Sequence, residues 1–219
     1  MTAAAPLEIE NLSFAYRNKR LFRDVSLTVK SGEFVTIMGE NGAGKTTLID
    51  LLVGHLSPSK GKIAFWGEKN SGAARDRIQQ KVGWVFAHKE DHAPWLKLDD
   101  IASAISPLYP NWNDDLFRRL SADFKLDLKA RISHLSSGEA SKFRLLKAVS
   151  FEPELLVLDE LTANLSPGSK DAITSLLLDR FSTGAMSVLY VCHSTDEALR
   201  LSDRVLTLSK DGLKEGVAK

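Results

Sequence analysis

A glycine-rich loop between a predicted strand and a predicted helix constrains this chain more than any other feature. Residues 33–38, EFVTIM, are β-rich, and residues 46–56, TTLIDLLVGHL, carry apolar side chains at helical spacing. The loop between them holds Gly39 and then the triplet Gly44-Lys45-Thr46, which is the spacing G-x-x-x-x-G-K-[ST]. Because glycines let the backbone turn tightly, several N–H groups point inward at an anion, and the helix N-terminus adds partial positive charge. The spacing predicts a phosphate-binding loop (P-loop); the alternative is a glycine-rich turn that matches by chance.

The residues of this loop have separate predicted roles toward a nucleoside triphosphate. Lys45 reaches the β- and γ-phosphates, and the Thr46 hydroxyl binds Mg²⁺. The backbone that surrounds the phosphates comes from Gly39, Asn41, Gly42, Ala43 and Gly44. By itself, the loop indicates only that a nucleoside triphosphate binds.

A second predicted strand ends in two acids. Residues 155–158, LLVL, are typical of a buried strand, and Asp159 and Glu160 follow directly. Acids at the carboxyl end of such a strand lie at the sheet edge where phosphates bind. Asp159 is therefore predicted to hold Mg²⁺ through water, and Glu160 to polarise the attacking water as a base. The alternative is a strand that stops in a charged turn.

Strand and helix patterns alternate along the chain, and this alternation predicts the fold class. Short strands are expected within residues 7–37, at LEIENLSFAY, VSLTV and EFVTIM, and strands alternate with helices from LLVLD onward. The region between is mainly helical, and Asn113 before two Asp residues matches a helix N-cap. We expect one α/β domain over residues 1–219, with a P-loop NTPase core (about 1–87 and 151–219), an N-terminal antiparallel β subdomain and an inserted helical lobe (about 88–150).

Composition excludes several protein classes. No run approaches the roughly 18 apolar residues of a membrane span, and the start MTAAAPLEIE lacks the features of a secretory signal. The single Cys192 excludes an internal disulfide framework. Because no export signal is recognised, a reducing cytoplasm is the expected compartment. The 29 Lys and Arg residues balance 28 Asp and Glu residues. Net charge therefore gives no indication of a nucleic-acid partner, and none is expected.

Four motifs in a fixed order point to a known family. GENGAGKTT, LSSGE at residues 135–139, LLVLDE and VCHS together resemble the ATP-binding subunit of ABC transporters over nearly the whole chain. The resemblance implies two subunits that meet head to tail around two ATP molecules. The second subunit would be another copy of this chain or a paralogous ATPase subunit. In that arrangement, LSSGE binds the γ-phosphate of the ATP that the other subunit holds.

The residue types in LSSGE suit this role. Ser136 offers a hydroxyl, Gly138 allows close backbone approach, and the N-terminus of the following helix favours an anion. A loop on an inserted lobe does not easily reach its own P-loop, which favours a partner chain. The alternative is a plain helix N-cap, because Ser136 with Glu139 three residues later matches a capping box. One loop can serve both purposes.

Three further positions take their roles from the resemblance. Tyr16 stands where the family places an aromatic ring against adenine, although a strand aromatic can instead pack in the core. His193 matches the histidine that contacts the γ-phosphate and helps orient the attacking water; the alternative is a structural histidine at a strand end. Thr47 continues the P-loop toward the α-phosphate.

One departure from the family pattern affects the loop after VGWVF. The family has a glutamine there that reaches Mg²⁺ and the water, whereas this chain has Ala87. Either His88 or Glu90 substitutes for that glutamine, or its role is lost. His88 and His92 are four residues apart, but a metal pair is not expected in this irregular, acid-rich loop.

Other departures lie after the second strand and in the helical region. Leu161 replaces the family's proline, and Ser166 replaces an aspartate that helps couple the two ATP sites, which puts strong coupling in doubt. The stretch LYPNWNDDLF resembles a subset of the family that pairs with exporter-type membrane subunits. Trp95 and Trp112 would then lie on or near the docking face, or else in the core of the lobe.

The sequence therefore predicts an ATPase that uses ATP and Mg²⁺ to power an ABC-type membrane transporter through integral membrane subunits. Its expected location is the cytoplasmic face of the cell membrane, and the exporter-type resemblance favours export. The alternative is a soluble ABC-type ATPase that acts as an assembly or regulatory factor without transport. A P-loop kinase or GTPase is disfavoured, because the chain has no NKxD-type motif and LSSGE has no role in such enzymes.

Overall fold

The computed structural model describes residues 4–17, 19–86, 94–163, 165–182, 184 and 186–216. Its strands are β1 (Leu7–Tyr16), β2 (Lys19–Val29), β3 (Phe34–Met38), β4 (Lys60–Ala64), β5 (Val82–Phe86), β6 (Leu155–Asp159), β7 (Ser187–Val191), β8 (Arg204–Ser209) and β9 (Gly212–Glu215). A smaller, antiparallel sheet has the order β2-β1-β4. A larger sheet has the order β5-β6-β7-β3-β8-β9, and its neighbours pair in parallel except for β8 and β9.

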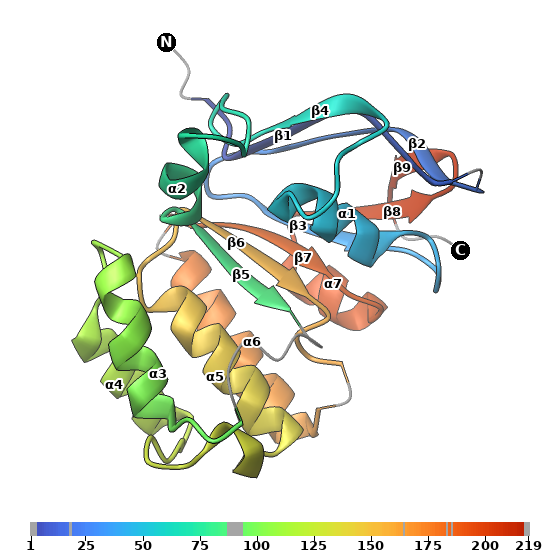
Figure 1. Cartoon of the computed structure of the whole chain (residues 1–219). Coiled ribbons are helices and arrows are strands. Elements are labelled where there is room, and N and C mark those ends of the chain that lie inside the picture. Colours follow the sequence, from blue (N-terminus) through green and yellow to red (C-terminus); the bar gives the residue numbers. More distant parts are fainter. Residues whose placement is uncertain are drawn as a thin grey trace.

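Helices cover both faces of the larger sheet. They are α1 (Lys45–Val53), α2 (Ala74–Gln79), α3 (Leu98–Ile105), α4 (Asp114–Asp123), α5 (Ser137–Val149), α6 (Pro167–Ser182) and α7 (Thr195–Leu201), with short 3₁₀ helices η1 (Ser106–Leu108) and η2 (Ile132–His134). Figure 1 shows α1 between the two sheets, and α5 and α6 on the opposite side of the larger sheet. Helices α3 and α4 lie beyond α5 and form the outer part of a helical lobe (Figure 1).

The central strands of the larger sheet are buried on both faces. Every residue of β3, β6 and β7 is buried, which explains why these segments read as continuous apolar runs. Val188 and Tyr190 of β7 join the core that contains α3, α4, α5 and α6, whereas Leu189 and Val191 join the core that contains α1 and the smaller sheet. The two cores thus fix the parallel strands, whose carboxyl ends meet at one edge.

The structure confirms the predicted alternation of strands and helices but extends it in two places. The predicted short strand VSLTV is only the second half of the 11-residue β2. The first half escaped recognition because Asp24 has a positive φ of 50° and the register with β1 shifts nearby, which breaks the two-residue alternation. Strand β9 was not expected, because it has only four residues, GLKE, and two of them are charged.

Three residues of the helical lobe test smaller predictions. Asn113 is the N-cap of α4, as predicted: its side chain accepts a hydrogen bond of 2.9 Å from the Leu116 N–H. Trp112 is half-buried against the lobe core, with its ring centroid 5.5 Å from that of Phe117. Trp95, in contrast, is 69% exposed. The two tryptophans therefore do not share one environment.

Candidate active site

The P-loop connects β3 to α1, and its geometry depends on two glycines. A Cβ atom on Gly39 would lie 2.7 Å from the Leu208 carbonyl oxygen. Gly44 has a φ of +102°, and a Cβ atom there would lie 2.8 Å from the Leu21 side chain. Only glycine fits these positions without displacing β8 or β2, so the predicted sequence pattern has a direct steric cause.

Lys45 is the first residue of α1, and its side chain folds back over the loop. Its Nζ donates to the carbonyl oxygens of Gly39 (2.9 Å) and Glu40 (3.2 Å). Burial lowers the pKa of Lys45, while the nearby carboxylates of Glu160 and Asp159 act in the opposite direction. The ammonium group is thus held at the loop by backbone acceptors, in a partly desolvated place that suits an anionic ligand.

Most of the residues that were predicted to bind the nucleotide line one pocket. Its volume is about 240 Å³, and among the described residues that line it, Leu21 was not predicted. The predicted residues that line it are Tyr16, Asn41, Gly42, Gly44, Lys45, Thr46, Thr47, Glu160 and His193. Gly39 and Ala43 belong to the same loop, and Asp159 precedes Glu160 at the end of β6. The pocket therefore gathers residues from four separate parts of the sequence.

Glu160 and His193 follow neighbouring parallel strands. Asp159 and Val191, the last residues of β6 and β7, are paired, so the residues that follow leave the sheet at the same edge. The Glu160 N–H donates to the Val191 carbonyl oxygen at 2.8 Å, and Glu160 has a positive φ of 48°. Nε2 of His193 lies 2.5 Å from Oε1 of Glu160. The two side chains thus form one unit at the mouth of the P-loop pocket.

Tyr16 ends β1 beside this pocket. Its side chain is 50% exposed, so the alternative of a buried core aromatic is wrong. The Phe14 ring packs edge-on against it, with ring centroids 4.9 Å apart. This contact orients the Tyr16 ring and leaves much of its surface available to a planar ligand.

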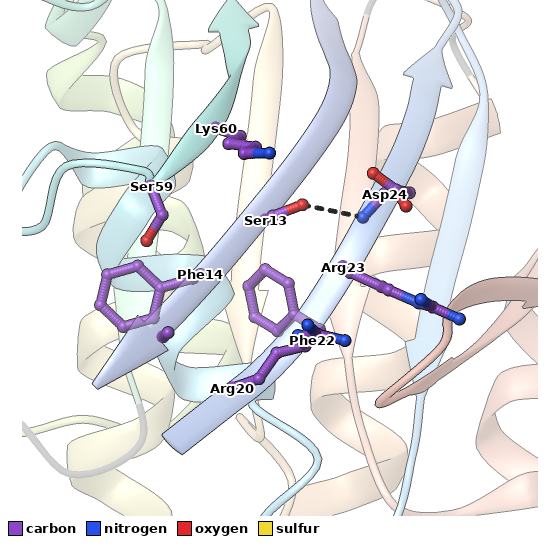
Figure 2. Close-up of a pocket in the computed structure, with 9 residues that line it drawn as sticks. Ser13, Phe14, Arg20, Phe22, Arg23, Asp24, Ser59 and Lys60 are labelled. Carbon is purple, nitrogen blue, oxygen red and sulfur yellow. Dashed lines mark hydrogen bonds between the residues drawn. The ribbon is translucent and has the colours of Figure 1, made fainter. Parts of the chain in front are cut away.

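A second hollow of about 330 Å³ lies on the smaller sheet and contains none of the predicted site residues. Figure 2 shows Arg20 and Arg23 of β2 and Lys60 of β4 around it, and the Asp24 N–H that donates to the Ser13 hydroxyl at 3.0 Å. It arises where the pairing of β1 and β2 is irregular. None of the described residues that line this hollow belongs to a predicted motif.

LSSGE opens helix α5 and forms the predicted capping box. The Ser136 hydroxyl accepts from the Glu139 N–H at 3.3 Å, and Oε2 of Glu139 accepts from the Ser136 N–H at 2.9 Å. Hydrogen bonds from Ser136 lower the pKa of Glu139. The predicted capping box is therefore confirmed for this loop. The other predicted role of the loop, binding the γ-phosphate of the partner's ATP, stays a prediction.

The LSSGE loop does not belong to the P-loop pocket. Ser136 and Gly138 are absent from its lining. Figure 1 shows the start of α5 at the far end of the helical lobe, well away from the start of α1. Within the chain, Gly138 lies against α6, where a Cβ atom on it would be 2.7 Å from Oγ of Ser169. The described part of one chain thus holds two phosphate-binding candidates that do not meet.

The departures after β6 have local explanations. Leu161 is 1% exposed and fills the lobe-side core where the family has proline. Ser166 precedes α6, and its hydroxyl donates to the Ser169 hydroxyl at 3.2 Å. Ala87, His88, Glu90 and His92 lie outside the described residues.

Sequence reasoning missed a polar cluster next to the catalytic pair. Oε2 of Glu197, on α7, accepts hydrogen bonds from the Thr162 and Tyr190 hydroxyls. Ser194 three residues before Glu197 matches an N-cap pattern, and the Glu197 N–H donates to its hydroxyl at 3.3 Å. That local pattern was readable, but the contacts with Thr162 and Tyr190 depend on the tertiary structure.

Two kinds of feature are absent from the described ranges. No helix there is both long and apolar enough to span a membrane. No group of three or more His, Cys, Asp or Glu side chains is assembled there as a metal site.

Comparisons with known proteins agree with this geometry. The family described as ABC transporter matches residues 22–163. The energy-coupling factor transporter ATP-binding protein EcfA of Malacoplasma penetrans (strain HF-2) is 31% identical, over 93% of this chain and 72% of the relative. The taurine import ATP-binding protein TauB of Sinorhizobium fredii (strain NBRC 101917 / NGR234) is 33% identical, over 84% of this chain and 69% of the relative.

A solved structure confirms the fold class. It is the dimeric, post-hydrolysis state of an ATP-binding cassette bound to ADP and Pi, with a TM-score of 0.80 and 20% identity. The match covers 97% of this chain and 99% of that one. The P-loop core, the antiparallel subdomain and the helical lobe are therefore those of an ATP-binding cassette. The chain belongs to the ABC transporter family, as an ATP-binding subunit that hydrolyses ATP.

Proposed function

We propose that this chain hydrolyses ATP in the P-loop pocket, between two head-to-tail subunits, and that closure of the pair powers a separate membrane transporter. One observation carries the proposal. Lys45, Glu160 and His193 converge on one pocket, while the LSSGE loop of the same chain is remote from it. Among the described residues, the LSSGE loop therefore makes no contact with its own pocket, and the LSSGE loop of a second subunit can supply a γ-phosphate contact there.

The P-loop pocket fits a triphosphate with Mg²⁺. Loop N–H groups and the Lys45 ammonium bind the phosphates, and the Thr47 hydroxyl lies toward the α-phosphate. Thr46 and Asp159 supply hard oxygen donors, which are the ligands that Mg²⁺ prefers. When bound, Mg²⁺ neutralises charge that develops on the phosphates. Tyr16 supplies an exposed ring for the adenine.

Glu160 and His193 act together on the attacking water. The Glu160 carboxylate accepts a hydrogen bond from the water and draws its proton, which makes the oxygen a better nucleophile. The His193 imidazole, held by Glu160 at 2.5 Å, orients toward the γ-phosphate.

The second subunit completes the site from the other side. Its Ser136 hydroxyl, its Gly138 backbone and the N-terminus of its α5 approach the γ-phosphate. The partner is a second copy of this chain or a paralogous ATPase subunit.

The transport role needs integral membrane subunits. Because the chain would bind to these subunits, we place it peripherally on the cytoplasmic face of the membrane. EcfA is named for an energy-coupling factor transporter and TauB for taurine import, so these names give no support to the predicted export. We assign no direction of transport. Purification of the tagged chain from detergent-extracted membranes tests this role: a co-purifying membrane protein supports it, and a chain that never associates with one supports the alternative assembly factor.

Dimer formation tests the shared site. Glu160→Gln should bind ATP without hydrolysing it and should elute as a dimer with ATP and as a monomer without it, in size exclusion with light scattering. Gly138→Ala in the same background is the matched control. Its new methyl meets a rotatable Ser169 hydroxyl, so it should fold and bind ATP yet remain monomeric. An ATP-bound monomer of the Glu160→Gln chain at high concentration would contradict a homodimeric site.

A further inference from the structure

A polar network lies next to the catalytic pair and involves neither the P-loop nor LSSGE. Oε2 of Glu197 accepts from Oγ1 of Thr162 at 2.6 Å and from the Tyr190 hydroxyl at 2.9 Å. The two hydroxyl oxygens lie 2.8 Å apart. Oε1 of Glu197 is 3.4 Å from Nζ of Lys170 on α6. One carboxylate therefore joins three separate elements.

The two hydroxyl partners of Glu197 are buried, whereas 39% of the Lys170 side chain is exposed. Thr162 and Tyr190 are 4% and 1% exposed. Burial also raises the pKa of Tyr190, so its hydroxyl stays protonated and remains a donor. A carboxylate removed from water needs such donors, and hydrogen bonds to a charged acceptor are stronger than neutral ones. The two hydroxyl groups and the carboxylate thus form a hydrogen-bonded junction between the segments.

The position of the junction in the chain connects it to catalysis. Thr162 is two residues after Glu160, and Glu197 is four residues after His193. A backbone hydrogen bond from the Glu160 N–H to the Val191 carbonyl oxygen joins the same two segments where they leave the sheet. The segments are therefore held on both sides of the contact between Glu160 and His193.

The junction also reaches the segment that departs from the family pattern. Lys170 lies in the first turn of α6, and its N–H donates to the Ser166 carbonyl at 3.0 Å. Ser169, in the same turn, lies against Gly138 of the LSSGE loop. The ion pair between Lys170 and Glu197 thus connects the catalytic pair to the start of α6 and, through it, to the start of α5.

We propose that Glu197 is a positioning residue for ATP hydrolysis. It holds the segments that carry Glu160 and His193 at a fixed separation and joins them to the start of α6. This inference rests on the proposed function of Glu160 and His193 and adds a residue that touches neither substrate nor water. None of its three partners lines the P-loop pocket. Loss of the junction should therefore lower kcat and leave the KM for ATP largely unchanged.

Kinetics of matched variants test the proposal. Glu197→Ala removes the acceptor, and kcat per folded molecule should fall about tenfold or more, since small misplacements of reacting groups cost up to about a hundredfold. Glu197→Gln keeps an amide oxygen for the two hydroxyls and should recover most of the rate. Asp196→Ala is the control, because Asp196 is an exposed acid in the same first turn of α7. A Glu197→Ala chain with the kcat of Asp196→Ala would overturn the proposal.

An NMR measurement gives a readout that does not need activity. The imidazole C–H signal of His193 is assigned by its loss in His193→Gln. In Glu197→Ala it should move toward its position in Glu160→Gln, because the contact between Glu160 and His193 loosens; in Asp196→Ala it should stay in place. An unmoved signal in Glu197→Ala would reject the positioning role even if the isolated chain is inactive.

Failure of the catalytic role of Glu160 can be distinguished from failure of the positioning role of Glu197. If Glu160→Gln hydrolyses ATP as fast as the unmodified chain, the catalytic assignment itself is wrong. If Glu160→Gln is inactive while Glu197→Ala retains full kcat, only the positioning role is wrong.

Discussion

Glu160 and His193 are in direct contact, with 2.5 Å between Oε1 of the carboxylate and Nε2 of the imidazole. The contact exists because β6 and β7 are parallel neighbours that end in register, at Asp159 and Val191. Parallel strands deliver their following residues to one sheet edge, and here that edge adjoins the P-loop.

Replacement of the catalytic carboxylate should separate binding from chemistry. Glu160→Gln keeps the size of the side chain but removes its basicity, so single-turnover hydrolysis should slow by about 10²–10⁴-fold. The affinity for ATP, measured with a fluorescent analogue, should change little because Lys45 and the loop are intact. A variant that loses affinity and rate in the same proportion would instead assign Glu160 to binding.

Lys45 should dominate the affinity for ATP. Lys45→Ala removes a charge that the P-loop carbonyls hold at 2.9 and 3.2 Å. A hydrogen bond to a charged group contributes about 1.5–3 kcal/mol, so the Kd for ATP should rise about tenfold or more in isothermal titration calorimetry. Lys60→Ala is the matched control, because Lys60 is exposed and lines the other hollow. Equal Kd values for the two variants would remove Lys45 from the site.

Tyr16 should contribute through its ring alone. Tyr16→Ala should weaken ATP binding by about 1–3 kcal/mol, the range for a base stacked on an aromatic side chain. Tyr16→Phe should bind nearly as well as the unmodified chain, because it keeps the ring and the edge contact with Phe14. Equal binding by Tyr16→Ala and Tyr16→Phe would show that adenine does not stack there.

The capping box should stabilise α5 in a pH-dependent way. The folded-state pKa of Glu139 is lowered from 4.5, chiefly by hydrogen bonds from Ser136. The stabilisation is therefore fully present at pH values above the pKa of Glu139 in the unfolded chain. It is lost as the pH falls through the lower pKa of Glu139 in the folded chain. Glu139→Ala should reduce the free energy of unfolding by about 0.5–1 kcal/mol at pH 7 and by less in acid. Urea unfolding at both pH values, with Glu139→Gln beside it, checks this; a pH-independent difference would contradict it.

The sequence predicted the parts of the site that lie within single motifs. The P-loop and the acids after β6 were readable because local chemistry demands them: Gly44 has a positive φ, and Asp159 ends a fully buried strand. The capping box was readable for the same reason. His193 was assigned only through the family resemblance. The structure shows in addition that these segments lie close together in space, which no single motif could predict.

Features that depend on contacts between distant segments were not predictable in this way. The junction of Glu197 with Thr162 and Tyr190 requires the pairing of β6 with β7 and the packing of α7, which no short window reveals. Irregular pairing at Asp24 hid half of β2, because a bulge breaks the alternation that marks a strand. The sequence did not show that Trp112 is partly buried and Trp95 exposed, because this difference depends on how the helical lobe packs.

The most direct test of the shared ATP site is steady-state ATP hydrolysis by the purified chain over a wide range of protein concentration, with Glu160→Gln alongside. The account predicts a specific activity that rises with concentration and then levels off as the head-to-tail pair forms, and no comparable rise for Glu160→Gln. An activity no higher than that of Glu160→Gln at every concentration would contradict the claim that two copies of this chain complete each other's site.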